Sequence, residues 1–217
     1  MFDNWEWFVF VVGALFFFGW FALGMQWNIR KGNNVLRWLR DGLPVIGEKT
    51  TMRWLGSSVV ELKIEKARDP FRNAETLVVL EPRDVSLLWA FYRARGRRDL
   101  LIFRAQTRAS PSFELEAIDP KAWTTHGIER DVQGKGWHAL QIDGGSGLNV
   151  YLANEVEANR AKTLLAQTMN MGGKLVRLSV HRTVPNLEAH WLLPDTNALA
   201  ARDWFIKLSQ VCKSASD

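Results

Sequence analysis

The stretch WEWFVFVVGALFFFGWFALGMQWNIRK, from Trp5 to Lys31, decides how the rest of the chain is interpreted. Between Trp7 and Trp27 it contains no charged residue. About 20 residues of α-helix measure ~30 Å, which is the thickness of the hydrocarbon layer of a bilayer. Because tryptophan favours the headgroup boundary, Trp5, Trp7 and Trp27 are expected at the membrane interface. The stretch therefore predicts a transmembrane helix over residues 7–27.

Two other interpretations of this stretch stay open. A secretory leader needs a basic segment before its apolar run, whereas Asp3 and Glu6 are acidic; the sequence Ala22-Leu23-Gly24 nevertheless resembles a cleavage site. A buried core helix would have to pack the six phenylalanines between Phe8 and Phe21 against a small domain. An uncleaved membrane anchor accounts for the length of the run and for both of its flanks.

Basic residues after the span indicate its orientation. The charged side chains before the apolar run, Asp3 and Glu6, are both acidic. Four basic residues follow the run before Asp41: Arg30, Lys31, Arg37 and Arg40. Loops rich in lysine and arginine stay on the cytoplasmic side of a membrane. We therefore expect residues 1–6 outside the cell and the C-terminal domain in the cytoplasm. The lone Cys212 agrees, because one cysteine cannot form an internal disulfide.

Residues 28–56 form a basic juxtamembrane segment. Three apolar residues in it recur at helical spacing: Val35, Trp38 and Leu39. Gly42 and Pro44 are expected to end this short helix. In one interpretation the helix lies in the headgroup plane, with Trp38 facing lipid and its arginines facing anionic headgroups. In the other, it is a linker helix that packs on the soluble domain.

Alternating apolar and polar residues predict strands in the remaining chain. The clearest runs are VVELKIEK (59–66), FELEA (113–117), VRLSVHR (176–182) and LEAHWLLP (187–194). This period of two indicates antiparallel sheets with one face exposed to water. Helices are expected after Pro82, after Asn154 and from about Asp195 onward. The fold class is therefore α+β, with a mostly antiparallel domain behind one transmembrane helix.

The order of these elements repeats along the chain. Residues 57–135 and 136–217 each contain the series strand, strand, helix, strand, strand, and the second half adds a C-terminal helix. Residue identity between the halves is low, so coincidence stays open as the alternative. Within the second half, matching inward residues predicts a hairpin in which Val180 faces Trp191 and His181 faces His190.

This hairpin would bring together the one cluster of residues in the sequence whose side chains are of the kinds that bind metals. His181, His190 and Glu188 could bind a divalent metal. The alternative is a pair of titratable surface histidines on the wet side of a hairpin, and no cofactor is expected. The motif HExxH is absent, as are GxxxxGK[ST] and GxSxG, and DGGSGLN (143–149) is interpreted as a hairpin turn.

The densest basic run, RARGRR, is the candidate for contacts with phosphate groups. The chain carries a net charge of +5, so lipid headgroups are favoured as partners and nucleic acid is disfavoured for lack of a recognition motif. Alternatively, the arginines complement the dipole at a helix C-terminus. The candidate residues for binding lipid or another polyanion are Arg30, Lys31, Arg37, Arg40, Arg93, Arg95, Arg97 and Arg98.

Without a catalytic signature, the sequence favours a non-enzymatic protein: a scaffold or assembly subunit of a membrane complex, whose partners are the bilayer and another membrane protein. Two rival functions stay open. One is an enzyme or ligand-binding protein that uses a cleft between duplicated units, and the other is an anionic-lipid or polyanion sensor. Gly13, Gly19 and Gly24 do not form a GxxxG motif, so self-association through the span lacks support and a homo-oligomer stays open.

Overall fold

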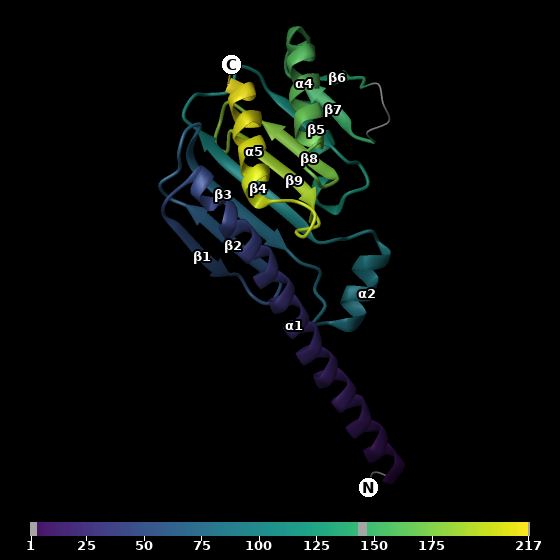
Figure 1. Ribbon diagram of the computed structural model, residues 1–217. Helices are drawn as coiled ribbons and strands as arrows, with labels where there is room; N and C mark the ends of the chain where they lie inside the picture. The colour runs from purple at the N-terminus through teal and green to yellow at the C-terminus, as the bar shows by residue number, and fades with distance from the viewer. Residues whose placement is uncertain (1–3, 143–146, 217) are drawn as a thin grey trace.

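Helix α1 (Asn4–Ile46) runs for 43 residues from the apolar N-terminal stretch into the domain. The computed structural model describes residues 4–142 and 147–216. Part of the expected outside terminus (1–3) and part of the expected turn (143–146) lie outside the described residues. The N-terminal half of α1 projects away from the domain, and its C-terminal half lies on it (Figure 1).

A nine-stranded sheet forms the centre of the domain. Its strands are β1 (Thr50–Trp54), β2 (Val59–Ile64), β3 (Phe71–Val79), β4 (Leu100–Thr107), β5 (Leu115–Ile118), β6 (His138–Leu140), β7 (Asn149–Leu152), β8 (Leu175–Val180) and β9 (Leu187–Leu192). They lie in the order β1-β2-β3-β4-β9-β8-β5-β7-β6, and every neighbouring pair is antiparallel. The expected α+β class with an antiparallel sheet is thus confirmed.

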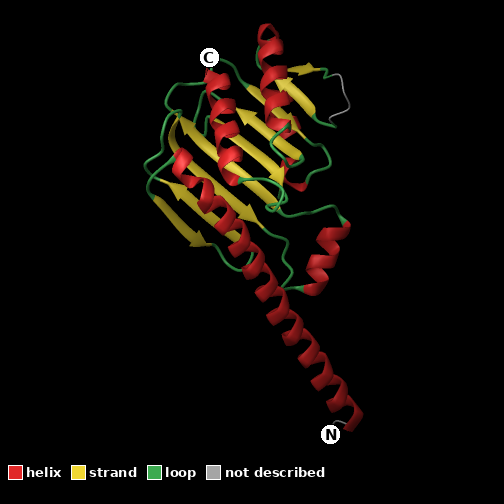
Figure 2. Cartoon of the chain, viewed as in Figure 1, coloured by secondary structure: helices red, strands yellow, loops and turns green. Residues whose placement is uncertain are grey.

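Most of the helices cover one face of this sheet (Figure 2). The short helix at residues 128–134 lies on the opposite face, where its Val132 packs with Ile118 and Tyr151. Besides α1, the described chain contains α2 (Ser86–Ala94), α3 (Ile128–Gly134), α4 (Ala158–Met169) and α5 (Ala201–Ser216), with short 3-10 turns at Trp123–Thr125 and Glu155–Glu157. The C-terminal half of α1, α5 and α4 lie side by side across the sheet (Figure 1). Helix α2 instead lies beside the middle of α1, near the point where α1 leaves the domain.

Trp204 of α5 lies at the centre of the main core. Its ring centroid is 5.9 Å from that of Trp38 on α1 and 5.4 Å from that of Trp191 on β9. All three side chains are buried. Aromatic rings of this size dominate the energetics of a core, and tilted or edge-on contacts between them are favourable. The cluster therefore joins α1, α5 and the sheet into one packed unit.

The juxtamembrane residues are a continuation of α1 and pack on the domain. Four apolar residues face the core along one stripe: Val35, Leu39, Leu43 and Ile46. This burial explains why the helix runs on to Ile46, although Gly42 and Pro44 were expected to end it. Gly42 is needed for a different reason, because a Cβ there would come within 2.7 Å of the Ala201 carbonyl oxygen on α5. Of the two interpretations of this segment, the packed linker helix is the one observed.

The two halves of the chain share one sheet. The expected series of strand, strand, helix, strand, strand is present in residues 59–118 and again in residues 138–192. However, β5 of the first half does not pair with β4; it lies between β7 and β8 of the second half. The strands of the first half (57–135) and of the second half (136–217) are therefore interleaved in one continuous sheet.

The expected register of the β8–β9 hairpin is wrong by four residues. Val180 pairs with Leu187, and His190 pairs with Arg177 rather than with His181. The reason is a short, closed turn: the Asn186 side-chain amide donates to the carbonyl oxygens of His181, Arg182 and Thr183 at 3.1–3.4 Å. A shift of four residues preserves which side chains face inward, so the alternating pattern alone could not exclude the wrong register.

Candidate functional site

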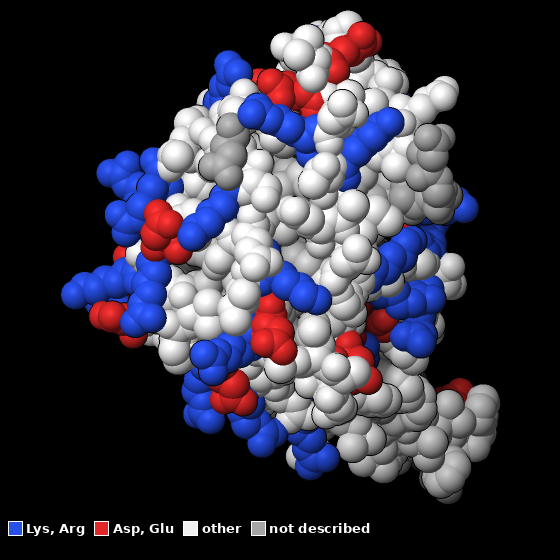
Figure 3. All heavy atoms as spheres, turned by 45° about the horizontal axis from the view of Figure 1, so that its top comes forward, with Lys and Arg blue, Asp and Glu red and all other residues white. Residues whose placement is uncertain are grey.

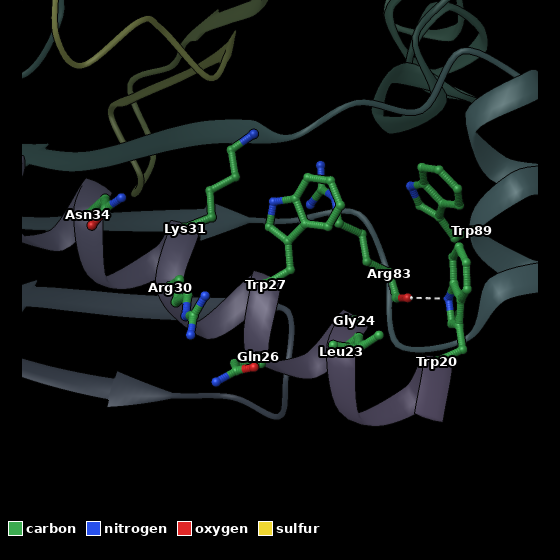
Figure 4. Close-up of a pocket in the computed structure, with 10 residues that line it drawn as sticks. All are labelled: Trp20, Leu23, Gly24, Gln26, Trp27, Arg30, Lys31, Asn34, Arg83 and Trp89. Carbon is green, nitrogen blue, oxygen red and sulfur yellow. Dashed lines mark hydrogen bonds between the residues drawn. The ribbon is translucent and has the colours of Figure 1, made fainter. Parts of the chain in front are cut away.

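A groove of about 610 Å³ lies between α1 and the segment that leads into α2. Figure 4 shows that its lining has an apolar part and a basic part. The apolar part contains Trp20, Trp27 and Trp89, and the basic part contains Arg30, Lys31 and Arg83. The lining residues of α1 extend from Trp20 to Asn34, so the groove includes the end of the predicted span at Trp27.

One stripe of α1 fixes the far wall of the groove. Gly24 faces the backbone of Arg83 so closely that an added Cβ would lie 2.1 Å from the Arg83 carbonyl oxygen. One turn before it, the Trp20 indole N–H donates to that same oxygen at 2.9 Å (Figure 4). One turn after it, the Asn28 side-chain amide donates to the Glu81 carbonyl oxygen at 3.0 Å. A spacing of four residues therefore places Trp20, Gly24 and Asn28 on the side of α1 that faces the 81–83 segment.

A network of charges lies beneath the basic part of the groove. Arg83 donates both of its terminal nitrogens to the Asp99 carboxylate at 3.0 and 2.8 Å, and the Lys31 ammonium reaches the same carboxylate at 2.6 Å. Burial would raise the pKa of Asp99, but the hydrogen bonds from Arg83 and Lys31 hold it below its usual value. Arg93 pairs with the buried Glu81 at 3.1 Å.

The basic side chains of the groove are not all paired with carboxylates. Two carboxylates, Asp99 and Glu81, face four cations, of which three are Arg83, Lys31 and Arg93. The fourth cation is Arg30. Its side chain is exposed and makes no hydrogen bond or ion pair within the described part of the chain. Because Lys31, Arg83 and Arg93 are paired with these carboxylates, Arg30 is the side chain that is free to bind an anion.

The arginine run after α2 does not form one binding surface. Of its four arginines, Arg93 alone reaches the groove network. The others lie on aromatic rings or on the helix end: Arg95 is 4.0 Å from the Phe91 centroid, Arg97 is 4.2 Å from that of Trp123, and Arg98 donates to the carbonyl oxygens of Arg93 and Arg97. Capping of terminal carbonyls by arginine is typical of a helix C-terminus.

Charges of both signs are mixed on the face of the domain drawn in Figure 3. Lys and Arg side chains lie among Asp and Glu side chains there and do not form a continuous basic surface. Nucleic-acid binding usually needs such a surface together with a recognition motif. The distribution on this face does not favour that partner.

Arg37 and Arg40 line a second groove, of about 500 Å³, between α1 and β1. Leu36 and Leu43 of α1 and Met52 of β1 supply its apolar surface. The basic residues that follow the span are thus divided by the helix between two sites: Arg30 and Lys31 lie in the first groove, and Arg37 and Arg40 lie in the second.

Strand β1 forms the outer edge of the sheet beside this second groove. Its backbone hydrogen bonds to β2 begin with Lys49, which accepts from Glu65, and end with Leu55, which donates to Val59. In an antiparallel ladder, residues that hydrogen-bond to the neighbouring strand alternate with residues whose N–H and C=O groups point away from it. The N–H and C=O groups of Thr50, Met52 and Trp54 therefore point away from β2. In the described part of the chain no strand pairs with them.

The predicted metal cluster does not form in the observed register. The His190 imidazole is 2.6 Å from the Glu188 carboxylate, whereas His181 lies beside Glu114 and Glu116 at 3.6 and 3.4 Å. Among the residues the structure describes, no group of three or more His, Cys, Asp or Glu side chains could hold a metal ion.

Glu188 instead belongs to a network of ion pairs on the sheet face opposite α1, α4 and α5. Arg104 and Arg177 both contact its carboxylate at 3.1 Å. Burial would raise the pKa of Glu188, but the hydrogen bond from His190 and the charges of His190, Arg177 and Arg104 lower it to about 2. These interactions give Glu188 a structural role, which is to hold together the charged side chains on this face of the sheet.

The four tryptophans expected at a membrane interface divide into two groups. Trp5, Trp7 and Trp27 are each at least 63% exposed on α1, as an interfacial role requires. Trp38 is 8% exposed, and its indole N–H donates to the Leu199 carbonyl oxygen, so its expected contact with lipid is wrong. Within the described residues, α1 is the one helix long and apolar enough to span a membrane.

Several residues of the two grooves could not be identified from the sequence. Arg83, Trp89 and Asp99 reach the first groove through segments distant from α1, and no local pattern marks them. Strand β1 was assigned to the juxtamembrane segment, although Thr50 and Met52 alternate with polar neighbours. No protein-family model matches this chain, and no curated protein matches it as a relative.

Proposed function

We propose that this chain is a single-pass membrane protein whose α+β domain acts as a non-enzymatic interaction module on the cytoplasmic side. Its N-terminus would lie outside the cell. Its role would be that of an accessory or assembly subunit, which holds a segment of a partner membrane protein beside the bilayer.

The first support is the continuity of α1. A leader cleaved after Gly24 would remove Trp20 and Gly24, which pack on the 81–83 segment. The same helix continues through Val35 and Ile46 into the core, so the domain is joined to the span without a flexible linker. An uncleaved anchor agrees with both features, and a partner bound to the domain would be held at a fixed place relative to the membrane.

The observation that carries the proposal is the unpaired edge of β1 beside the second groove. An extended peptide can add to such an edge, with backbone hydrogen bonds supplying affinity and neighbouring pockets supplying specificity. The outward groups of Thr50 and Met52 would pair with the added strand. Its apolar side chains would contact Leu36 and Leu43, and its acidic side chains would meet Arg37 and Arg40.

The experiment is affinity purification of the full-length protein in mild detergent, with mass spectrometry of the proteins that accompany it. The test variant is Met52→Pro, which removes one outward N–H group and leaves the hydrogen bonds to β2 intact. Its matched control is Met52→Thr, which shortens the same side chain and keeps the N–H group. We expect a stoichiometric membrane protein with the wild type, its retention with Met52→Thr, and its loss with Met52→Pro.

Charge reversal tests the specificity of the second groove. We expect Arg37→Glu with Arg40→Glu to release the partner, whereas Lys162→Glu on the distant α4 should not. Equal retention of the partner by Met52→Pro and by the wild type would exclude strand addition at β1. A wild-type protein that purifies alone would contradict the proposed function itself.

A further inference from the structure

We propose that the groove between α1 and α2 binds one anionic phospholipid from the membrane leaflet that faces the domain. The phosphate would lie at Arg30, and an acyl chain would follow the tryptophans toward the bilayer. This site is separate from the edge of β1 and does not depend on a protein partner.

The height of the groove along α1 is the first argument. Trp20 and Asn34, the outermost lining residues of α1, are 14 positions apart, which corresponds to ~21 Å along the helix axis. Trp27, the predicted end of the span, lies midway between them. A lipid headgroup occupies this same boundary between hydrocarbon and water.

The distribution of side chains along the groove matches the two ends of a phospholipid. On the membrane side of Trp27 lie Trp20, Leu23 and Trp89, with the rings of Trp20 and Trp89 6.2 Å apart. On the domain side, on the next turn of α1, lie Arg30 and Lys31, whose side chains point in different directions (Figure 4). Lys31 reaches Asp99 at 2.6 Å, which leaves Arg30 as the free cation. An amphipathic ligand aligned with the bilayer would place its apolar and charged parts against the matching surfaces.

The charge of the site favours an anionic lipid over a neutral one. Within the described residues, three cations and no carboxylate line the groove. Lys31 and Arg83 are paired with Asp99, and the Arg30 side chain has no intramolecular partner there. Arg83 also lies over the Trp27 ring at 5.8 Å, which orders the wall between the two parts of the groove. The guanidinium of arginine can bind a phosphate through two parallel hydrogen bonds.

The outer wall of the groove is continuous with a surface suited to the membrane. None of the residues of α2 is buried, and four apolar side chains of this region face outward: Val85, Leu87, Leu88 and Phe91. Leu87 is 84% exposed. A short helix with an apolar face and with arginines at its end is typical of an element that lies in the headgroup layer. With α2 in that layer, the groove opens directly to lipid.

Native mass spectrometry of the full-length protein tests this site. The protein is reconstituted in nanodiscs of phosphatidylcholine with one fifth phosphatidylglycerol, released into mild detergent, and scored for retained phosphatidylglycerol. The test variant is Arg30→Gln. Its matched control is Arg37→Gln, the same change two turns further along the same helix but in the other groove. Arg30→Lys keeps the charge.

We expect one retained phosphatidylglycerol on the wild type and on Arg37→Gln, and a loss of about fivefold with Arg30→Gln, because one basic side chain near an anionic surface contributes about 1 kcal/mol. Arg30→Lys should retain most of the lipid. Inorganic phosphate in excess should not displace it, because the acyl chain contributes to binding. Equal retention by all variants, or displacement by free phosphate, would overturn the proposal. Loss of a protein partner through Met52→Pro should leave lipid retention unchanged, which separates the two proposals.

Discussion

Gly42 offers a sharp test of how α1 is joined to the domain. Replacing a glycine by alanine within a helix normally stabilises the helix, by about 0.5–1 kcal/mol, because it reduces the freedom of the unfolded chain. Here the added Cβ would lie 2.5 Å from Cδ2 of Phe205 and 2.7 Å from the carbonyl oxygen of Ala201. The Phe205 ring can rotate a little, but a backbone oxygen cannot, so α1 and α5 must separate.

The two effects have opposite signs, and the clash is the larger. Overpacking of a dense core costs about 1–3 kcal/mol. We therefore expect Gly42→Ala to lower the free energy of unfolding by up to about 2.5 kcal/mol after the gain in helix propensity is subtracted. The matched control is Gly134→Ala at the end of α3, where an added Cβ has no heavy atom within 4 Å. That change should be neutral or stabilising by up to about 1 kcal/mol.

The assay is guanidinium denaturation of the full-length protein in detergent micelles, followed by the fluorescence of the core tryptophans. The two alanine variants should shift the midpoint in opposite directions. If Gly42→Ala stabilises the protein as much as Gly134→Ala does, the helices do not touch at Gly42. The rigid connection between span and domain would then be refuted.

Two further predictions concern the core and the sheet face. Trp204→Ala should lower the free energy of unfolding by about 3–5 kcal/mol in the same assay, because it removes the ring shared by α1, α5 and the sheet; a loss below about 1 kcal/mol would contradict the central place given to this ring. The pKa of Glu188 is lowered to about 2 in the folded protein, so its ionised form stabilises the fold above about pH 4.5, and this stabilisation is lost as the pH falls toward 2. Glu188→Gln should lower stability at pH 7 and flatten the fall of the unfolding free energy between pH 4 and 3 by up to about 1.4 kcal/mol per pH unit; an unchanged slope in an acid titration would show that Glu188 is not the group responsible.

Local patterns in the sequence predicted the elements of the fold well. The alternation in VVELKIEK and LEAHWLLP marks β2 and β9, because one face of each strand is buried and the other is polar. A helix was expected after Asn154, and the Asn154 side chain accepts a hydrogen bond from the Val156 N–H at the start of the turn that leads into α4. These features depend on neighbours within a few residues.

Features that depend on distant segments could not be predicted. The predicted register of the β8–β9 hairpin was wrong because Asn186 closes a tighter turn. The alternation of inward and outward side chains is the same in both registers and could not distinguish them. The insertion of β5 between β7 and β8 has no local signal. Val35 and Leu39 look the same in sequence whether their helix lies on lipid or on protein, and only the position of α5 distinguishes the two. For the same reason the first groove was half predicted, with Arg30 and Lys31 identified and Arg83 missed.

The most direct test of the account is the position of the domain relative to the membrane. Cys212 is fully buried, and burial raises the pKa of its thiol, so it should not react with a maleimide in the folded protein. A cysteine introduced by Lys162→Cys on the exposed face of α4, or by Glu6→Cys before the span, can therefore be labelled selectively in sealed membrane vesicles. We expect an impermeant maleimide to label Glu6→Cys in right-side-out vesicles alone and Lys162→Cys in inside-out vesicles alone. Labelling of Lys162→Cys from the outside, or recovery of the protein in the soluble fraction with a shortened N-terminus, would contradict the proposed cytoplasmic, membrane-anchored domain.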